Sequence, residues 1–162
     1  MEVQQDKVEQ EVSVADLLSP SRVDLDCRFT SKKRLMEHVA SMLARGTDMD
    51  EQAVFRILIE REKLGSTGVG HGVALPHGRL EDIDNAILAL AILADPLDYQ
   101  AADNRHVRIV VGLVVPENAN EAHLQILARL AKLLSEARVR ERLLQASDKE
   151  EIFSALREVE AG

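Results

Sequence analysis

The sequence predicts a single α/β domain in which helices flank one mixed β-sheet. Two apolar runs, 86–93 and 107–115, have the length and the β-branched content of strands that are buried on both faces. Amphipathic segments precede and follow these runs, so helices are available to cover the sheet. The 162 residues match the size of one domain, about 150 residues, and contain no internal repeat.

The composition fits a globular protein and excludes several functional classes. Hydrophobic residues make up 46% of the chain, too many for a largely disordered one. The 28 acidic and 20 basic residues give a net charge of -8, which repels nucleic-acid phosphates and anionic lipid surfaces. The longest apolar run, 86–94, is about half the length of a membrane span. We therefore expect a cytoplasmic protein that neither binds nucleic acid nor inserts into a membrane.

The N-terminal part of the chain is polar before it becomes periodic. Residues 1–12 are acidic and lack helical or strand periodicity, so we expect a flexible leader ahead of a domain that spans 13–160. A short apolar turn over 14–18 is expected to stop at Pro20, and the alternating segment 23–26 predicts a short edge strand. The lone Cys27 cannot form an intrachain disulfide and is expected to be a small buried side chain.

Two amphipathic helices are predicted next. Thr30 or Ser31 is a suitable N-cap for the first, whose apolar residues keep helical spacing up to Gly46. Asp48 and Glu51 form a capping-box pattern, which predicts that a second helix begins there and runs toward Gly65.

Strands and then helices are predicted in the second half. Residues 73–75 predict a short strand ahead of the two long apolar ones. Asn120 is the predicted N-cap of a strongly periodic helix, and 137–145 predict another. A final helix is predicted from Asp148, with Glu151 completing its capping box.

Glycines are concentrated in one segment. Five of the eight lie between residues 65 and 78, and such a density lets successive backbone N–H groups form a nest that binds anions. The alternative is a tight loop between a helix and a strand. The segment lacks the Gly-Lys-Ser/Thr of a phosphate-binding loop, and a helix rather than a strand precedes it, so the sequence gives nucleotide binding little support.

Three residues are candidates for phosphoryl chemistry near this segment. His77 lies between Pro76 and Gly78 at the end of a predicted strand, where a rigid backbone would hold a nucleophilic imidazole beside an anion site. His123 falls in the first turn of the helix capped by Asn120, where free N–H groups favour an anion. Arg61 would supply a neutralising cation, although each of the three residues also has a purely structural interpretation.

Metal binding and hydrolysis have less support. His71 and His77 are on the order of 20 Å apart if the chain between them is extended, at about 3.3 Å per residue, which is too far for one ion. Without a His-x-x-x-His or a cysteine pair, we expect no metal site and no cofactor. Ser66 lacks the surroundings of a hydrolase nucleophile, and no chemistry is assigned to His38 or His106.

The glycine-rich segment REKLGSTGVGHGVALPHGR at 61–79 resembles the signature of the mannitol/fructose-type enzyme IIA domains of the bacterial phosphotransferase system. The segment PENANEAHLQIL at 116–127 is similar to the family's other histidine segment, and the nitrogen-related enzyme IIA is the most similar branch. The resemblance implies a sheet of about five strands and a phosphoryl group accepted on Nε2 of His77, with His123 beside it. It implies that Arg61 and Thr67 line the phosphate site, with the adjoining Ser66 and Gly68.

The resemblance also implies a function and partners. The donor would be a histidine phosphocarrier of the HPr type, here an NPr-like one, fed ultimately by phosphoenolpyruvate. The chain would then be a phosphotransferase component whose phosphorylation state regulates partners, with potassium-transport and sensor-kinase proteins as the implied targets. Because no linker or membrane segment is present, we expect regulation rather than sugar uptake. The alternatives are a fructose- or mannitol-specific IIA that feeds a transporter, and a non-enzymatic module that binds a small anion.

Overall fold

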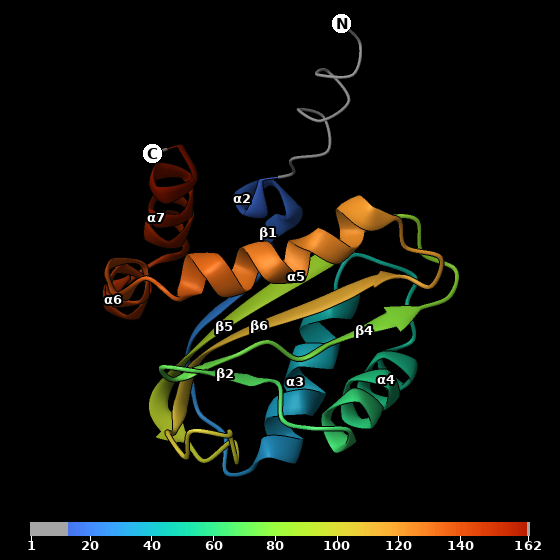
Figure 1. Cartoon of the computed structure of the whole chain (residues 1–162), viewed down its shortest axis with the longest axis horizontal. Helices are drawn as coiled ribbons and strands as arrows, with labels where there is room; N and C mark the ends of the chain where they lie inside the picture. Colours follow the sequence, from blue (N-terminus) through green and yellow to red (C-terminus); the bar gives the residue numbers. More distant parts are fainter. Residues whose placement is uncertain (1–12, 162) are drawn as a thin grey trace, which may run out of the picture.

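A computed structural model describes residues 13–161 and shows one sheet between two layers of helices (Figure 1). The flexible leader predicted at 1–12 lies outside the described residues. The elements in chain order are α2 Val14–Leu17, β1 Leu18–Cys27, α3 Lys32–Ala44, α4 Glu51–Lys63, β2 Gly68–Gly70, β3 Val73–Ala74, β4 His77–Leu80, β5 Ile87–Leu97, β6 Val107–Pro116, α5 Glu121–Leu134, α6 Ala137–Gln145 and α7 Lys149–Ala161.

The sheet is mixed and has six strands, one more than the resemblance implied. Its order is β1-β5-β6-β3-β2, and β4 pairs with β6 farther along the same side as β3. The central β5 and β6 are antiparallel, whereas β1 runs parallel to β5, and β3 and β4 run parallel to β6. This pairing fixes the start of β4, because His77 lies opposite Leu113 of β6.

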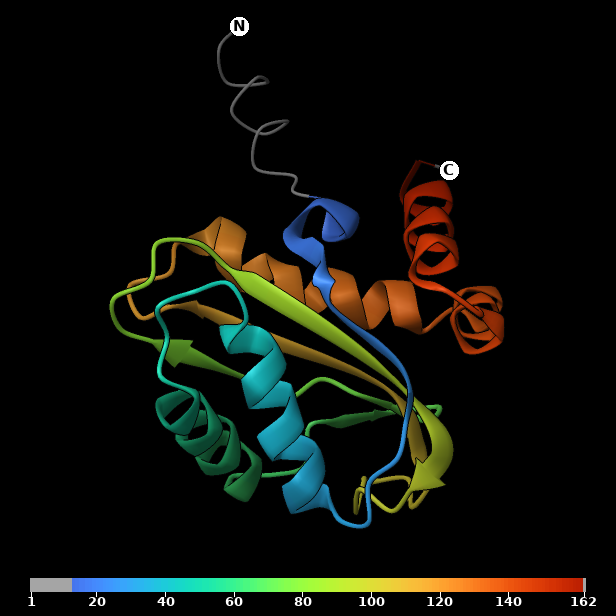
Figure 2. The ribbon, with the colours of Figure 1, turned by 180° about the vertical axis from the view of Figure 1, so that it is seen from behind.

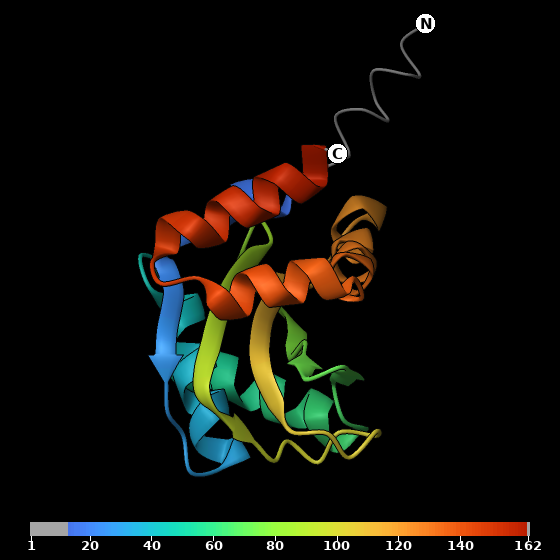
Figure 3. The same ribbon diagram turned by 90° about the vertical axis from the view of Figure 1, so that its left-hand side faces the viewer.

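Each face of the sheet is covered by its own helices. Alternate residues of β5 point in opposite directions, as in any strand. Leu88, Leu90 and Ile92 join the core beneath α2, α5, α6 and α7, whereas Ala89, Ala91 and Leu93 join the core beneath α3 and α4. Figure 2 shows α3 and α4 in front of the strands, and Figure 3 shows α5, α6 and α7 on the other side. None of the helices within 13–161 is both long enough and apolar enough to cross a membrane.

The helices begin where the local sequence predicts, with two differences in detail. Ser31 and Asn120 accept hydrogen bonds from the backbone N–H groups of Arg34 and His123, so both predicted caps are confirmed. The N-cap of α4 is Asp50 rather than Asp48, because Asp50 accepts from the N–H of Gln52. Asp48 and Glu51 therefore do not form the expected box. At α7, Asp148 accepts from the N–H of Glu151 as predicted, but the Glu151 carboxylate accepts from Ser147.

The sheet extends into two segments where the sequence predicted turns. The apolar turn ends at Leu17, ahead of Pro20, and β1 begins at Leu18. Pro20 therefore lies within this edge strand, where the missing N–H of a proline is tolerated. Within the glycine-rich segment, β2 forms an antiparallel pair with β3. The extension of β1 depends on pairing with the distant β5, whereas β2 pairs with β3, its neighbour in the chain.

Candidate functional site

A pocket of about 470 Å³ opens between α4, β4, β6 and α5 and contains three of the residues singled out from the sequence. Arg61 reaches it from the last turn of α4, His77 from the first residue of β4, and His123 from the first turn of α5. Arg61 lies 16 positions before His77 in the chain (77 - 61), and His123 lies 46 positions after it (123 - 77). The parallel pairing of β4 with β6 helps to bring the three together.

The imidazole of His77 is fixed by the backbone. Its Nδ1 lies 2.7 Å from the carbonyl oxygen of Leu75. Since a carbonyl only accepts hydrogen bonds, Nδ1 carries the proton and Nε2 keeps its lone pair. The half-buried ring therefore presents its nucleophilic nitrogen in one defined tautomer.

The pocket around His77 is lined by two arginines and by one carboxylate, that of Glu60. Arg61 lines the pocket and donates a hydrogen bond to the carbonyl oxygen of Gly65 (2.9 Å). Arg79 also lines it and was not predicted as a site residue. The sequence held a signal for Arg79, because residues i and i+2 of a strand project to the same side and His77 opens β4. Two guanidinium groups and one carboxylate thus share the pocket with the imidazoles of His77 and His123, which leaves the arginines in excess.

His123 lies at the same pocket with one ring nitrogen unpaired. Its backbone N–H donates to the side chain of Asn120 (3.0 Å), which holds the first turn of α5 in place. Within 13–161, its buried Nδ1 has no hydrogen-bond partner. Buried polar atoms are usually paired. The Nδ1 of His123 is therefore an exception among the buried polar atoms of the described residues.

Thr67, Ser66 and Gly68 are placed beside the pocket rather than in its lining. The hydroxyl of Ser66 accepts a hydrogen bond from the N–H of Gly68 (3.1 Å), and Gly68 begins β2. Thr67 is only 4% exposed. Its hydroxyl donates to a carboxylate oxygen of Glu62 and lies 2.8 Å from the hydroxyl of Tyr99. These three residues shape the loop behind His77.

Glu62 is the centre of a polar cluster that holds this loop. Its carboxylate accepts from Thr67, from the hydroxyl of Tyr99 (3.1 Å) and from Lys32 (2.6 Å). Burial alone would raise the pKa of the Glu62 carboxyl, but the bonds from Lys32 and Thr67 outweigh it and hold the pKa below its ordinary value. Burial raises the pKa of Tyr99, which therefore stays protonated. Sequence analysis missed this cluster because Tyr99 lies 37 residues beyond Glu62.

The cluster is connected to His77 by backbone hydrogen bonds. The carbonyl oxygen of Thr67 accepts from the N–H of Leu75 (2.9 Å), and the carbonyl oxygen of Leu75 accepts from His77. A continuous path thus runs from Glu62 through two peptide groups to the imidazole. The position of the reactive nitrogen depends on this path.

A second group of functional side chains lies elsewhere in the fold. His38, to which the sequence assigned no chemistry, is 2.7 Å from the carboxylate of Asp24. Cys27 is half-buried rather than fully buried and is near both. Burial and the carboxylates of Asp24 and Asp26 raise the pKa of the Cys27 thiol to about 11. Within the described residues, Asp24, Cys27 and His38 are the one group with the donors and spacing for a metal ion.

Comparison with known proteins gives a consistent result. Residues 16–159 match the family model "Phosphoenolpyruvate-dependent sugar phosphotransferase system, EIIA 2". The nitrogen regulatory protein of Pseudomonas aeruginosa is 38% identical over 152 residues, which cover 93% of this chain and 99% of that protein. The crystal structure of nitrogen regulatory protein IIA-Ntr from Neisseria meningitidis has a TM-score of 0.84 at 39% identity, over 88% of this chain and 98% of that one. A fructose-specific EIIA component from Haloferax volcanii is 36% identical over 110 residues, 68% of this chain and 71% of that protein.

Proposed function

Because the chain belongs to the EIIA 2 family of the phosphoenolpyruvate-dependent sugar phosphotransferase system, among its nitrogen regulatory members, we propose that it is a phosphohistidine carrier that accepts a phosphoryl group on Nε2 of His77. The donor in this proposal is a cytoplasmic histidine phosphocarrier of the HPr type, NPr-like in this branch. The output is regulation of partner proteins by the phosphorylation state of His77. Potassium-transport and sensor-kinase proteins are the classes of target to test.

The hydrogen bond between His77 and Leu75 is the observation that supports this proposal most directly. In the transfer, the lone pair of Nε2 forms a bond to phosphorus while the phosphorus–nitrogen bond of the donor phosphohistidine breaks. The donor imidazole leaves with the electron pair of that bond. Positive charge develops on the attacking ring, and the Leu75 carbonyl at 2.7 Å stabilises the Nδ1–H that carries it.

The cationic pocket supports the same chemistry. A phosphoryl group bound to His77 adds a charge of about -1.5 to -2, which Arg61 and Arg79 neutralise. In this proposal a ring N–H of His123, which lines the same pocket, donates a hydrogen bond to a phosphoryl oxygen. Direct contact of Ser66, Thr67 or Gly68 with the phosphate stays a prediction, and Thr67 has to release a bond to Glu62 or Tyr99 to make it.

The rim of the pocket fits a protein donor. Leu64 is 85% exposed and Leu124 is 47% exposed, and both line the pocket that contains His77. Apolar side chains around a charged centre are typical of a protein–protein interface. Phosphorylation changes the charge at the middle of this surface and therefore changes which partners bind it.

Phosphorylation by a reconstituted phosphorelay tests the proposal. The purified chain is incubated with phosphoenolpyruvate, enzyme I and either an HPr or an NPr carrier, and its intact mass is measured over time. We expect one added phosphoryl group, faster with NPr, that is lost in mild acid and is stable in base. The variant His77→Gln should gain nothing, whereas His106→Gln, which changes an exposed histidine, should behave as the wild type.

Other results of this experiment identify the alternatives. Phosphate on Ser66 or Thr67 would contradict the assignment of His77. Transfer from the phosphorylated chain to a fructose IIB protein would favour the sugar-specific function, to which the likeness to the Haloferax volcanii protein points. No phosphorylation by either carrier, with tight binding of a free phosphorylated metabolite, would favour an anion-binding module.

A further inference from the structure

Asp24, Cys27 and His38 bring three different metal-binding side chains together away from His77. Asp24 and Cys27 belong to β1 and His38 to α3, and their ligand atoms all lie within 4.8 Å of one another. They line a pocket of about 480 Å³ that shares no residue with the His77 pocket. The proposed phosphocarrier chemistry uses none of the three.

An irregularity in β1 creates this group. In a regular strand, residues three apart project to opposite faces. Here Asp24 pairs with Ala91 and Cys27 with Leu93, so β1 uses three steps where β5 uses two. Asp26, within the extra step, has a φ of 55°, a left-handed backbone that is costly for most residues. The bulge turns Cys27 to the side of Asp24.

The neighbouring residues orient the three side chains. Arg45 donates to both carboxylate oxygens of Asp24, at 3.1 and 3.0 Å. Nε2 of His38 is 2.7 Å from Oδ2 of Asp24, and the ring of Phe29 packs against the imidazole at 5.1 Å between centroids. Such outer contacts fix ligand geometry at known metal sites. Because Asp24 is ionised, His38 is the donor and carries its proton on Nε2.

The ligand types select the metal. A thiolate, an imidazole and a carboxylate are ligands of Zn²⁺ and chemically similar divalent ions, whereas Mg²⁺ and Ca²⁺ require oxygen ligands. The carboxylates of Asp24 and Asp26 lie near the thiol, and the guanidinium of Arg45 balances one of those charges. The same pocket is lined by Asp148, by Arg28, which pairs with Asp95, and by Lys149, so the ligand types, rather than an excess of negative charge, favour a metal here. Zinc sites with three protein ligands keep a fourth position for water.

We propose that Asp24, Cys27 and His38 bind one divalent transition-metal ion of the zinc class, with water as the fourth ligand. The ion replaces the proton between Nε2 of His38 and Oδ2 of Asp24, and these atoms move apart from 2.7 Å to about 3.4 Å, the separation of two ligands in a tetrahedral zinc site. That proton moves to Nδ1 of His38, the thiol of Cys27 releases its proton to solvent, and the ion is coordinated by sulfur, nitrogen and oxygen. The site is independent of the proposed phosphorylation of His77.

Cobalt spectroscopy tests this proposal, because Co²⁺ occupies zinc sites and reports its ligands. The untagged, reduced full chain is titrated with Co²⁺. We expect saturation at one ion per chain, a near-ultraviolet charge-transfer band from sulfur to cobalt, and the intense visible bands of a tetrahedral site. Addition of Zn²⁺ should abolish both sets of bands.

Matched variants assign the ligands. Cys27→Ser should remove the charge-transfer band. Asp24→Asn and His38→Gln should weaken binding by more than the roughly 10- to 100-fold that loss of an outer-shell partner costs. The double change His71→Gln/His106→Gln, which removes two exposed histidines, should bind cobalt as the wild type does. A band that persists in Cys27→Ser, or binding lost in the double control, would overturn the proposal.

A second measurement avoids reliance on any variant's folding. Alkylation of Cys27 in the wild-type chain is followed with and without Zn²⁺. At a zinc concentration 100 times Kd, about 1% of the protein is free, so alkylation should slow by about 100-fold. An unchanged alkylation rate, together with absent cobalt bands, would show that the three side chains form only a structural cluster.

Discussion

The two ring nitrogens of His77 differ because, among residues 13–161, only Nδ1 has a hydrogen-bond partner, the carbonyl of Leu75. That carbonyl is held in turn by the hydrogen bond from Leu75 to Thr67 and by the bonds of Thr67 to Glu62. Thr67 therefore has two possible roles, as a direct ligand of phosphate or as a residue that positions His77. The two roles predict different behaviour when its hydroxyl is removed.

Thr67→Val separates these roles. Valine keeps the shape but leaves a buried oxygen of Glu62 with one partner fewer, so we expect a loss of about 1–3 kcal/mol in unfolding free energy. The Nδ1 proton of His77, observed by NMR, should exchange faster with water. Ser66→Ala, which changes the neighbouring half-buried residue, should affect both measurements much less. Unchanged stability with strongly slowed phosphorylation would instead identify Thr67 as a phosphate ligand.

Arg61 is predicted to act on transfer rather than on folding. Arg61→Ala should slow phosphorylation of His77 by about 10²-fold or more, the scale seen when one electrostatic donor to a transition state is removed. Unfolding free energy should fall by only about 0.3–1 kcal/mol, because the side chain is partly exposed at a helix end.

The control for this change lies on the same helix. Arg56 is exposed on α4 and does not line the pocket, so Arg56→Ala should leave the transfer rate unchanged. Equal slowing of the Arg56 and Arg61 variants would mean that general charge, not the pocket, accounts for the effect.

At the scale of elements, α3 packs closely on β6 at Gly112. A Cβ atom on Gly112 of β6 would lie 2.5 Å from Cγ1 of Val39 on α3, which is closer than atoms can pack. Gly112→Ala should therefore lower the unfolding free energy by about 1–3 kcal/mol through overpacking. Val39→Ala removes the clashing methyl group. In urea unfolding, the double variant should lose less than the sum of the two single variants. Additive losses would contradict this account of the contact.

Elements with local signals were predictable from the sequence. Ser31, Asn120 and Asp148 cap helices because a side-chain oxygen reaches an N–H two or three residues away, which short patterns report. The strands β2 and β4 were not predicted, since they exist only through pairing with β3 and β6. The bulge at Asp26 likewise depends on the register with β5.

In the candidate site, too, some residues have a local signal in the sequence and others do not. His77, Arg61 and His123 could be singled out because glycines, a helix end and a helix start mark them locally. Arg79 required knowing that β4 begins at His77. The contact of Tyr99 with Thr67 joins residues 32 positions apart and has no local signal. Side chains that position a site are therefore harder to predict than those that face its ligand.

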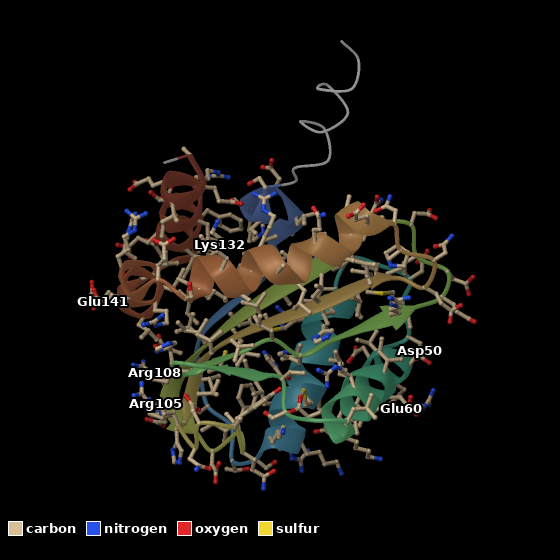
Figure 4. All side chains as sticks on the ribbon, viewed as in Figure 1. Asp50, Glu60, Arg105, Arg108, Lys132 and Glu141 are labelled. Carbon is tan, nitrogen blue, oxygen red and sulfur yellow. The ribbon has the colours of Figure 1, made fainter. Side chains whose placement is uncertain are left out.

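At the scale of the whole molecule, acidic groups dominate. The net charge is -8, and exposed carboxylates such as Asp50, Glu60 and Glu141 project from the helices (Figure 4). Acidification reduces this charge and with it the mutual repulsion. It also protonates carboxylates that stabilise the fold.

The hydrogen bonds of Glu62 to Lys32 and Thr67 hold its pKa below the ordinary value. Its contribution to stability is therefore present at neutral pH and is lost as the pH falls through that lowered pKa.

The difference in unfolding free energy between the wild type and Glu62→Gln isolates this contribution, because the overall charge of the two proteins changes with pH in nearly the same way. At pH 7 the variant should be less stable by about 1–3 kcal/mol, since Lys32 loses its ionic partner in a mostly buried cluster. As the pH falls below the ordinary glutamate pKa of about 4.3 and on through the lowered pKa of Glu62, the wild-type carboxyl becomes protonated and resembles glutamine, so the difference should shrink toward zero. Urea unfolding at about pH 7, 4 and 3 measures it. Glu141→Gln, an exposed change on α6, should stay within about 0.5 kcal/mol of the wild type throughout. A difference between wild type and Glu62→Gln that grows on acidification would mean that the Glu62 carboxyl is protonated more readily in the fold than in the unfolded chain.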